Sequence, residues 1–276
     1  METRHFTVAL VTDVFHGPEG AQRLHTRLAA AKAQQAALAV LPEIPLNPWS
    51  PATQVCKEED AEPPGGWREH QLSAAAAACG IAVLGGVIRC DPATGNRYNT
   101  ALLVDRSGLV VACYEKLHLP EEEGFWETSH YIAGRYGPKV TRAIGPGLGV
   151  QICSDANRPV GAQILAAQGV DIILAPRATE AATYDRWRLV YQAMALTASA
   201  FVVSVNRPGP EAGVPVGGPS LVVNPEGTVT LETTDPVAVA TLDLGLAAQA
   251  HRRYPGYLTF PAEVYADAWH NHESGS

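Results

Sequence analysis

The sequence predicts an α/β fold: a four-layer αββα sandwich in which a single domain, residues 1–276, is built from two similar βαβαββ halves. Short segments rich in Val, Ile and Leu alternate with longer segments of helical periodicity, as is typical of βαβ units. The same order of segments occurs twice along the chain. The chain has 276 residues, 46% of them hydrophobic, which is enough apolar material for one large core.

The first half contains strands and helices in strict alternation, followed by a hairpin. Short apolar runs predict the strands, and Ala/Leu faces of helical spacing predict the helices. In order, these elements are a strand at 6–13, a helix at 20–37, a strand at 38–43, a helix at 66–79, a strand at 81–89 and a hairpin at 99–116 that turns at 105–108.

The second half repeats this order. Its elements are a strand at 148–155, a helix at 159–169, a strand at 170–177, a helix at 183–199, a strand at 200–207, a hairpin at 218–232 that turns at 224–227 and a last strand at 237–244. If helices cover one face of each half-sheet, the two bare faces can be buried against each other. The four predicted layers follow from this pairing.

Two segments fall outside the repeat. Residues 117–147 form a long insertion without clear periodicity, and such segments are usually functional loops. The residues after about 262 form a polar tail that we leave out of the predicted core.

Composition excludes several classes of function. The net charge is −8 with no basic stripe, so we expect no nucleic-acid partner. We see no signal peptide and no apolar run of about 18 residues, so we expect no membrane association. The five cysteines are scattered without a CxxC pair, which favours free thiols over a disulfide framework or a zinc site. Free thiols suit a reducing cytoplasm, so we expect a cytoplasmic protein.

Three polar residues lie where predicted strands end, and chemistry in α/β sheets tends to sit beyond the carboxyl ends of strands. They are Glu43, Lys116 and Cys153. Each also has a structural interpretation, as a solvated strand end, a surface lysine or a small core residue. The other four cysteines lack the strand before and the turn into a helix after that Cys153 has.

This arrangement has a chemical logic. A helix that begins just after Cys153 would point backbone N–H groups at the sulfur, which would lower the thiol pKa and provide an oxyanion site. A nearby carboxylate could take the thiol proton, and an ammonium could stabilise a tetrahedral oxyanion. The three residues together suit thiol attack on a carbon bonded to nitrogen.

With these residues in hand, the chain resembles the nitrilase superfamily, the carbon–nitrogen hydrolases, over roughly residues 5–260. The family's strand-then-PE element appears as LAVLPE with Glu43, its YxKxHLP element as YEKLHLP with Lys116, and its apolar run before C-x-D as GVQICSD with Cys153. The resemblance implies an αββα sandwich and a Glu–Lys–Cys triad. Two further stretches, NRPGPE and GGPSLVVNPEG, also match.

The resemblance also implies roles beyond the triad. The backbone N–H of Ser154 would help Lys116 to hold the oxyanion. A second family glutamate, eleven residues beyond the lysine, corresponds to Glu127, whereas the neighbouring glutamates 121–123 suit a solvated acidic loop. We expect His118, two residues after Lys116, to organise the loop.

The reaction that the resemblance implies is hydrolysis of a linear amide or N-carbamoyl substrate to an acid and ammonia or an amine, without a metal or an organic cofactor. Nitrile-cleaving relatives commonly read Cys-Trp-Glu where this chain reads Cys-Ser-Asp, which favours amides. A nitrilase, an acyltransferase and a non-catalytic binding protein on the same scaffold stay open as alternatives. Relatives assemble through helices beside the active site, which implies a homodimer or larger oligomer.

Substrate contacts are predicted from residue type. Arg177 ends a strand equivalent to the strand of Glu43, and Arg158 follows the nucleophile closely. Arginine matches carboxylates with two parallel hydrogen bonds, so we expect one of them, Arg177 before Arg158, to bind an acidic substrate group. A structural role for either arginine is equally compatible with the sequence. Trp126 and Tyr184 could line the pocket or simply pack.

Overall fold

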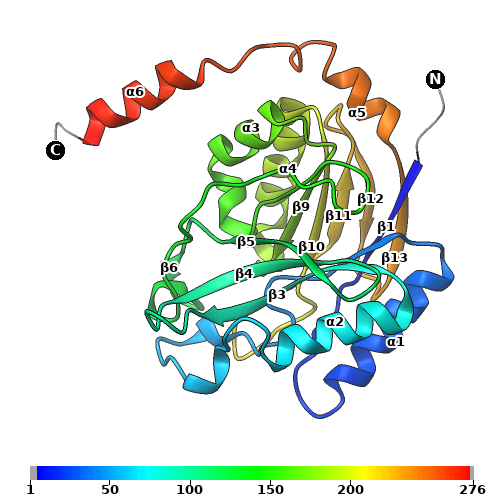
Figure 1. Cartoon of the computed structure of the whole chain (residues 1–276), viewed down its shortest axis with the longest axis vertical. Coiled ribbons are helices and arrows are strands. Elements are labelled where there is room, and N and C mark those ends of the chain that lie inside the picture. The colour runs from blue at the N-terminus through cyan, green and yellow to red at the C-terminus, as the bar shows by residue number, and fades with distance from the viewer. Residues whose placement is uncertain (1–4, 274–276) are drawn as a thin grey trace.

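Two β-sheets packed face to face form the centre of the molecule, and helices cover their outer faces (Figure 1). The structure is a computed structural model, and it describes residues 5–273. The order of its layers is helix, sheet, sheet, helix, as predicted. None of the helices in this range is both long and apolar enough to cross a bilayer.

The first sheet has six strands in the order β13-β1-β2-β3-β4-β5. Strands β1, β2 and β3 are parallel, and the remaining pairs are antiparallel. The elements of this half are β1 (His5–Leu10), α1 (Gly20–Ala33), β2 (Leu38–Val40), α2 (Trp67–Cys79), β3 (Ala82–Cys90), β4 (Arg97–Val104) and β5 (Val110–Glu115). Helix α2 ends at Gly80, whose left-handed φ of 61° suits a residue without a Cβ.

The second sheet has five strands in the order β12-β11-β10-β9-β8, with β8, β9 and β10 parallel. Its elements are β8 (Leu148–Val150), α3 (Pro159–Ala167), β9 (Ile172–Arg177), α4 (Tyr184–Ala198), β10 (Phe201–Asn206), β11 (Ser220–Val223) and β12 (Val229–Thr233). Helix α3 starts with Pro159, a residue suited to the first helical turn because it lacks the N–H that would be unpaired there.

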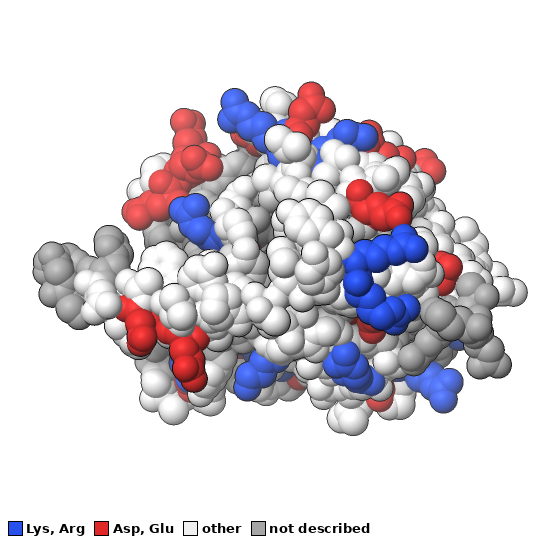
Figure 2. Space-filling view, turned by 90° about the horizontal axis from the view of Figure 1, so that it is seen from above, with Lys and Arg blue, Asp and Glu red and all other residues white. Residues whose placement is uncertain are grey.

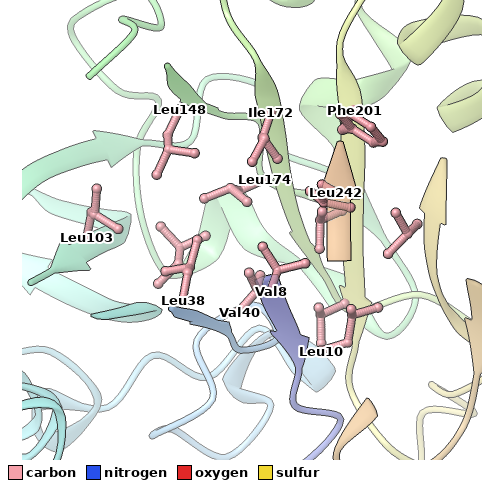
Figure 3. Packing of buried hydrophobic residues seen from close by; sticks show 14 of the residues in the cluster. Val8, Leu10, Leu38, Val40, Leu103, Leu148, Ile172, Leu174, Phe201 and Leu242 are labelled. Atoms are coloured by element: carbon pink, nitrogen blue, oxygen red, sulfur yellow. The ribbon is translucent and has the colours of Figure 1, made fainter. Parts of the chain in front are cut away.

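Apolar side chains from both sheets meet in the middle layer. Leu38 and Val40 of the first sheet and Ile172 and Leu174 of the second belong to one buried cluster (Figure 3). Separate clusters join each sheet to its own helices, one with Leu28 of α1. Full burial of such a side chain contributes about 1.5–3 kcal/mol, so the middle layer holds the two half-sheets together.

The last strand of the repeat joins the other half of the molecule. Strand β13 (Ala238–Asp243) pairs antiparallel with β1 and so extends the first sheet, although it follows β12 in sequence. Helix α5 (Leu244–Ala250) follows it. The segment expected as a polar tail contains α6 (Ala262–Glu273), which extends away from the two sheets (Figure 1).

The insertion between the halves carries little regular structure. It holds the two-residue strands β6 (Glu121–Glu122) and β7 (Phe125–Trp126), which pair with each other, and a 3₁₀ turn at Glu127–Ser129. The insertion thereby returns to the sheet edge and buries Glu127, while the side chains at 121–123 stay exposed.

Candidate active site

The two sheets bring the predicted residues together from distant parts of the chain. Glu43 follows β2 and Lys116 follows β5 in the first sheet, and Cys153 follows β8 in the second. Glu127 reaches the same place from the insertion. All four residues are at most 5% exposed. The edge predicted from strand ends is therefore one buried cluster.

Lys116 lies at the centre of this cluster. Its Nζ is 2.7 Å from Glu43 Oε1 and 2.5 Å from Glu127 Oε1. Glu43 also accepts hydrogen bonds from Asn99 Nδ2 at 2.8 Å and from the backbone N–H of Ala178 at 3.1 Å. Three donors on one carboxyl group are the pattern of a carboxylate, which only accepts. Sequence reasoning missed Asn99, which sits inside a strand pattern and shows its role only through this contact.

Cys153 sits on a tight backbone turn. Its φ is 46°, a left-handed value that a residue with a Cβ rarely adopts. Such strain persists only where the surroundings enforce it and is common at functional sites. The turn directs the thiol to the carbonyl oxygen of Ala178, to which it donates at 3.6 Å.

The predicted strand and helix around Cys153 are both shorter than expected. Strand β8 ends at Val150, a 3₁₀ turn spans Cys153–Asn157, and α3 begins only at Pro159. The expected lowering of the thiol pKa is wrong. Burial, and then the Glu43 carboxylate, raise the pKa of Cys153 well above its usual value despite the opposing effect of Lys116. The resting nucleophile is therefore a thiol.

Electrostatics in the cluster follow from two carboxyl groups sharing one ammonium. Burial raises the pKa of Glu127 to about 8, although Lys116 opposes the shift. Burial lowers the pKa of Lys116, but Glu127 and Glu43 outweigh it and the net shift is upward. A lysine that stays charged and a glutamate that holds its proton keep the buried charge close to balanced.

One side of Glu127 is open for a further contact. Its Oε2 is buried and, among the described residues, has no hydrogen-bond partner, and the same holds for the hydroxyl of Tyr131. Buried polar atoms normally have partners. Because the other oxygen of Glu127 contacts Lys116, its Oε2 marks a place near the ammonium where a substrate or a water molecule can be bound.

Asp155 fixes the two loops that carry Lys116 and Cys153. Its carboxylate accepts from the backbone N–H groups of Leu117, His118 and Ile152, from the His118 ring and, at 2.9 Å, from the hydroxyl of Tyr114. Ser154 adds a hydrogen bond from its Oγ to His118 O at 2.5 Å. His118 thus organises the loop, as predicted. Asp155 itself was missed, because the C-x-D spacing alone does not reveal its partners.

A second clamp holds the loop of Glu43. Arg207, which follows β10, is fully buried and donates to the carbonyl oxygens of Glu43 and Ile44 at 2.9 and 3.0 Å. Its guanidinium also pairs with Glu211 Oε2 at 2.6 Å. Ile44 has a φ of 37°, so this clamp holds a strained residue next to Glu43. The NRPGPE stretch thereby receives a positioning role.

The predicted substrate contacts fall in different places. Arg177 is fully buried; it donates to Ser204 Oγ at 3.0 Å, to Thr179 Oγ1 and to Pro219 O, and no carboxylate in residues 5–273 pairs with it. The ring centroid of Tyr184 lies 5.8 Å from the guanidinium carbon of Arg177. Arg158 is exposed at the start of α3, away from the cluster. Trp126 is half-buried in β7, one residue before Glu127.

Known proteins share both the sequence pattern and the fold. Residues 15–252 match the carbon–nitrogen hydrolase family. The deaminated glutathione amidase of Synechocystis sp. (strain PCC 6803 / GT-S) is 28% identical over 171 residues, which are 58% of this chain and 63% of that protein. The N-carbamoylputrescine amidase of Arabidopsis thaliana is 28% identical over 174 residues, 56% of this chain and 58% of that protein. The matches thus span less than two thirds of either relative.

A solved structure extends the similarity to nearly the whole fold. Saccharomyces cerevisiae Nit3, a member of branch 10 of the nitrilase superfamily, superposes with a TM-score of 0.79 and 25% sequence identity. The superposition covers 94% of this chain and 97% of that one. The αββα sandwich is therefore the nitrilase-superfamily fold.

Proposed function

The chain belongs to the carbon–nitrogen hydrolase family, and we propose that it hydrolyses a linear amide or N-carbamoyl substrate through a thioester on Cys153. The observation that carries this proposal is the buried Lys116 ammonium held between two carboxyl groups, 2.7 Å from Glu43 and 2.5 Å from Glu127, next to a thiol on a strained turn. Burying four ionisable groups together costs free energy, and clusters of ionisable groups with perturbed pKa values are concentrated at functional sites.

The first half of the reaction forms the thioester. Because the resting sulfur is a thiol, Glu43 removes its proton while Sγ attacks the carbonyl carbon. Lys116 and the backbone N–H of Ser154 stabilise the oxyanion that forms. Glu43 then passes the proton to the departing nitrogen, the C–N bond breaks, and ammonia or an amine leaves.

The second half releases the acid. Glu43 takes a proton from a water molecule, the resulting hydroxide attacks the thioester carbon, and the C–S bond breaks. The proton held by Glu43 returns to the sulfur, which restores the starting enzyme. Glu127, through its unpartnered Oε2, orients the substrate nitrogen or this water. The similarity of this chain to proteins named deaminated glutathione amidase and N-carbamoylputrescine amidase supports an amide or carbamoyl substrate rather than a nitrile.

The surroundings of Arg177 are evidence that the substrate carries an acidic group. Burial lowers the pKa of this guanidinium, and only neutral groups in the described part of the chain accept its hydrogen bonds. A buried cation without a counter-ion gains most from an anion that arrives with the substrate. Arg158 is too exposed to serve this role in the buried cluster.

The C-terminal segment supports assembly of the chain into a homodimer or a larger oligomer. Large apolar side chains are exposed along residues 254–269, among them Tyr254, Tyr257, Leu258, Val264, Tyr265 and Trp269. Exposed apolar runs of this kind mark interaction surfaces. Figure 2 shows a broad area of uncharged residues at the centre of the face seen from above, with most charges toward its margins.

Ammonia release from a panel of small amides, N-carbamoyl amino acids, ureido acids and nitriles tests the function. Wild-type enzyme should act on an amide or a carbamoyl compound and Cys153→Ala should be inactive, while Cys113→Ala, which alters an exposed thiol, should retain full activity. Turnover by Cys153→Ala would overturn the proposal. Activity confined to nitriles would replace it with a nitrilase.

A further inference from the structure

A cavity of about 500 Å³ opens between the two sheets at the edge formed by β5 and β8. Each of these is the last strand of its sheet, so the sandwich is not closed on this side. None of Glu43, Lys116, Glu127 and Cys153 lines the cavity. It is therefore separate from the candidate active site.

The walls of the cavity are apolar and come from both sheets. Leu84, Ala101 and Leu103 line it from the first sheet, and Leu148, Val150 and Leu174 line it from the second. Figure 3 shows Leu103 of the first sheet and Leu148 and Leu174 of the second among the buried residues packed between the sheets. Protein interiors hold few voids larger than a water molecule, whereas pockets for small ligands have roughly 300–1,000 Å³.

The rim of the cavity carries one cation without an acidic partner. Arg135 pairs with Asp91 and Glu115 at 3.4 and 3.5 Å, and Arg89 pairs with Glu69 at 2.7 Å. Lys139 is exposed and makes no ion pair with any carboxylate in residues 5–273. Asp91 and Glu115 share the single guanidinium of Arg135, so an anionic group at the rim would find its free cation at Lys139.

We propose that this cavity binds an amphipathic carboxylate of the medium-chain fatty-acid class. The hydrocarbon chain lies at the open edge of the cavity against the half-buried side chains of Ala112 and Val150, and the carboxylate remains at the rim beside Lys139. The apolar walls supply most of the affinity, because burial of a hydrocarbon chain is the dominant favourable contribution in such pockets. The ammonium sets the preference for an acid over a neutral alcohol. This inference is independent of the proposed catalytic function.

Calorimetric titration of the full-length protein with decanoate tests the site. Decanoate should bind, and decanol, which lacks the charge, should bind more weakly. Lys139→Ala should weaken decanoate binding about two- to fivefold, in line with an exposed ion pair, and Lys57→Ala, at another exposed lysine away from the cavity, should leave it unchanged.

Two cavity-filling variants test where the chain binds. Ala112→Phe from β5 and Val150→Phe from β8 should each abolish binding, so that the test survives if one of them does not fold. Cys153→Ala should bind decanoate with wild-type affinity. Absence of binding by the wild type, unchanged binding in folded filling variants, or loss of binding in Cys153→Ala would each overturn the proposal.

Discussion

Cys153 and Glu43 contact the same residue from opposite sides of the interface between the sheets. The thiol donates to the carbonyl oxygen of Ala178 at 3.6 Å, and the Glu43 carboxylate accepts from the N–H of Ala178 at 3.1 Å. Ala178 follows β9 directly, so the end of one strand positions both the nucleophile and its base. Small movements of this strand end would separate the two groups.

Replacing Glu43 should remove proton transfer while preserving the shape of the site. Glu43→Gln keeps the size of the side chain and loses the base, so we expect kcat to fall by a factor of about 10²–10⁴. Ammonia release measures this effect. Glu69→Gln, a matched change at a carboxylate outside the cluster, should retain wild-type turnover. A Glu43→Gln enzyme with near-normal kcat would assign the base to another group.

Removing the ammonium of Lys116 should destabilise the fold as well as stop catalysis. Lys116→Met leaves two buried carboxyl groups without their cation, and breaking a buried pair costs about 3–5 kcal/mol. Urea unfolding should show this loss. The double variant Lys116→Met/Glu43→Gln should recover part of it, because it removes the carboxylate charge that Lys116 balances, whereas Glu127 already holds its proton. Equal stability of the single and double variants would argue against charge sharing.

The raised pKa of Glu127 predicts a pH-dependent stability. Between its ordinary value of 4.5 and about 8, the folded state retains a proton that the unfolded state has lost. The free energy of unfolding should therefore fall as the pH rises through this window. Glu127→Gln cannot lose that proton, so its unfolding free energy should decline less between pH 5 and pH 8. Parallel curves for the two proteins would contradict the shift.

Glu211 should make the free energy of unfolding depend on pH in the opposite direction. Burial opposes ionisation, but His16 and Arg207 together lower the pKa of Glu211 to about 2. Its stabilising contribution is thus present above about 4.5 and is lost as the pH falls toward 2. Glu211→Gln should be less stable than the wild type at pH 6, and this difference should shrink on acidification. Because Arg207 also holds the Glu43 loop, kcat should fall in the same variant at neutral pH.

The exposed C-terminal segment should govern assembly. Tyr265→Glu/Trp269→Glu places charges on α6, where both side chains are about half exposed and the fold of the sheets is not involved. Light scattering should show a smaller particle for this variant than for the wild type. Val55→Glu, at an exposed apolar residue far away in sequence, should leave the mass unchanged. A monomeric wild type would end this proposal.

The sequence pattern was sufficient to place residues that terminate strands. Glu43, Lys116 and Cys153 each follow a short apolar run, and parallel strands bring such ends to one edge. The pairing of β13 with β1 was beyond this reasoning, because any strand with a bare edge could have accepted it. Asp155 and Arg207 were missed as positioning residues because their roles depend on backbone groups far away in sequence. The predicted direction of the Cys153 pKa shift was wrong, because burial of the thiol, which depends on packing, outweighs the effect of the local turn.

The cluster draws its parts from both sheets: Glu43 and Lys116 from the first, Cys153 and Ala178 from the second. Turnover therefore reports whether the two sheets are docked, and not merely whether each has formed. A swollen intermediate with its strands and helices intact but its middle layer loosened would keep its far-UV circular dichroism and lose activity. During refolding, activity should be the last signal to return.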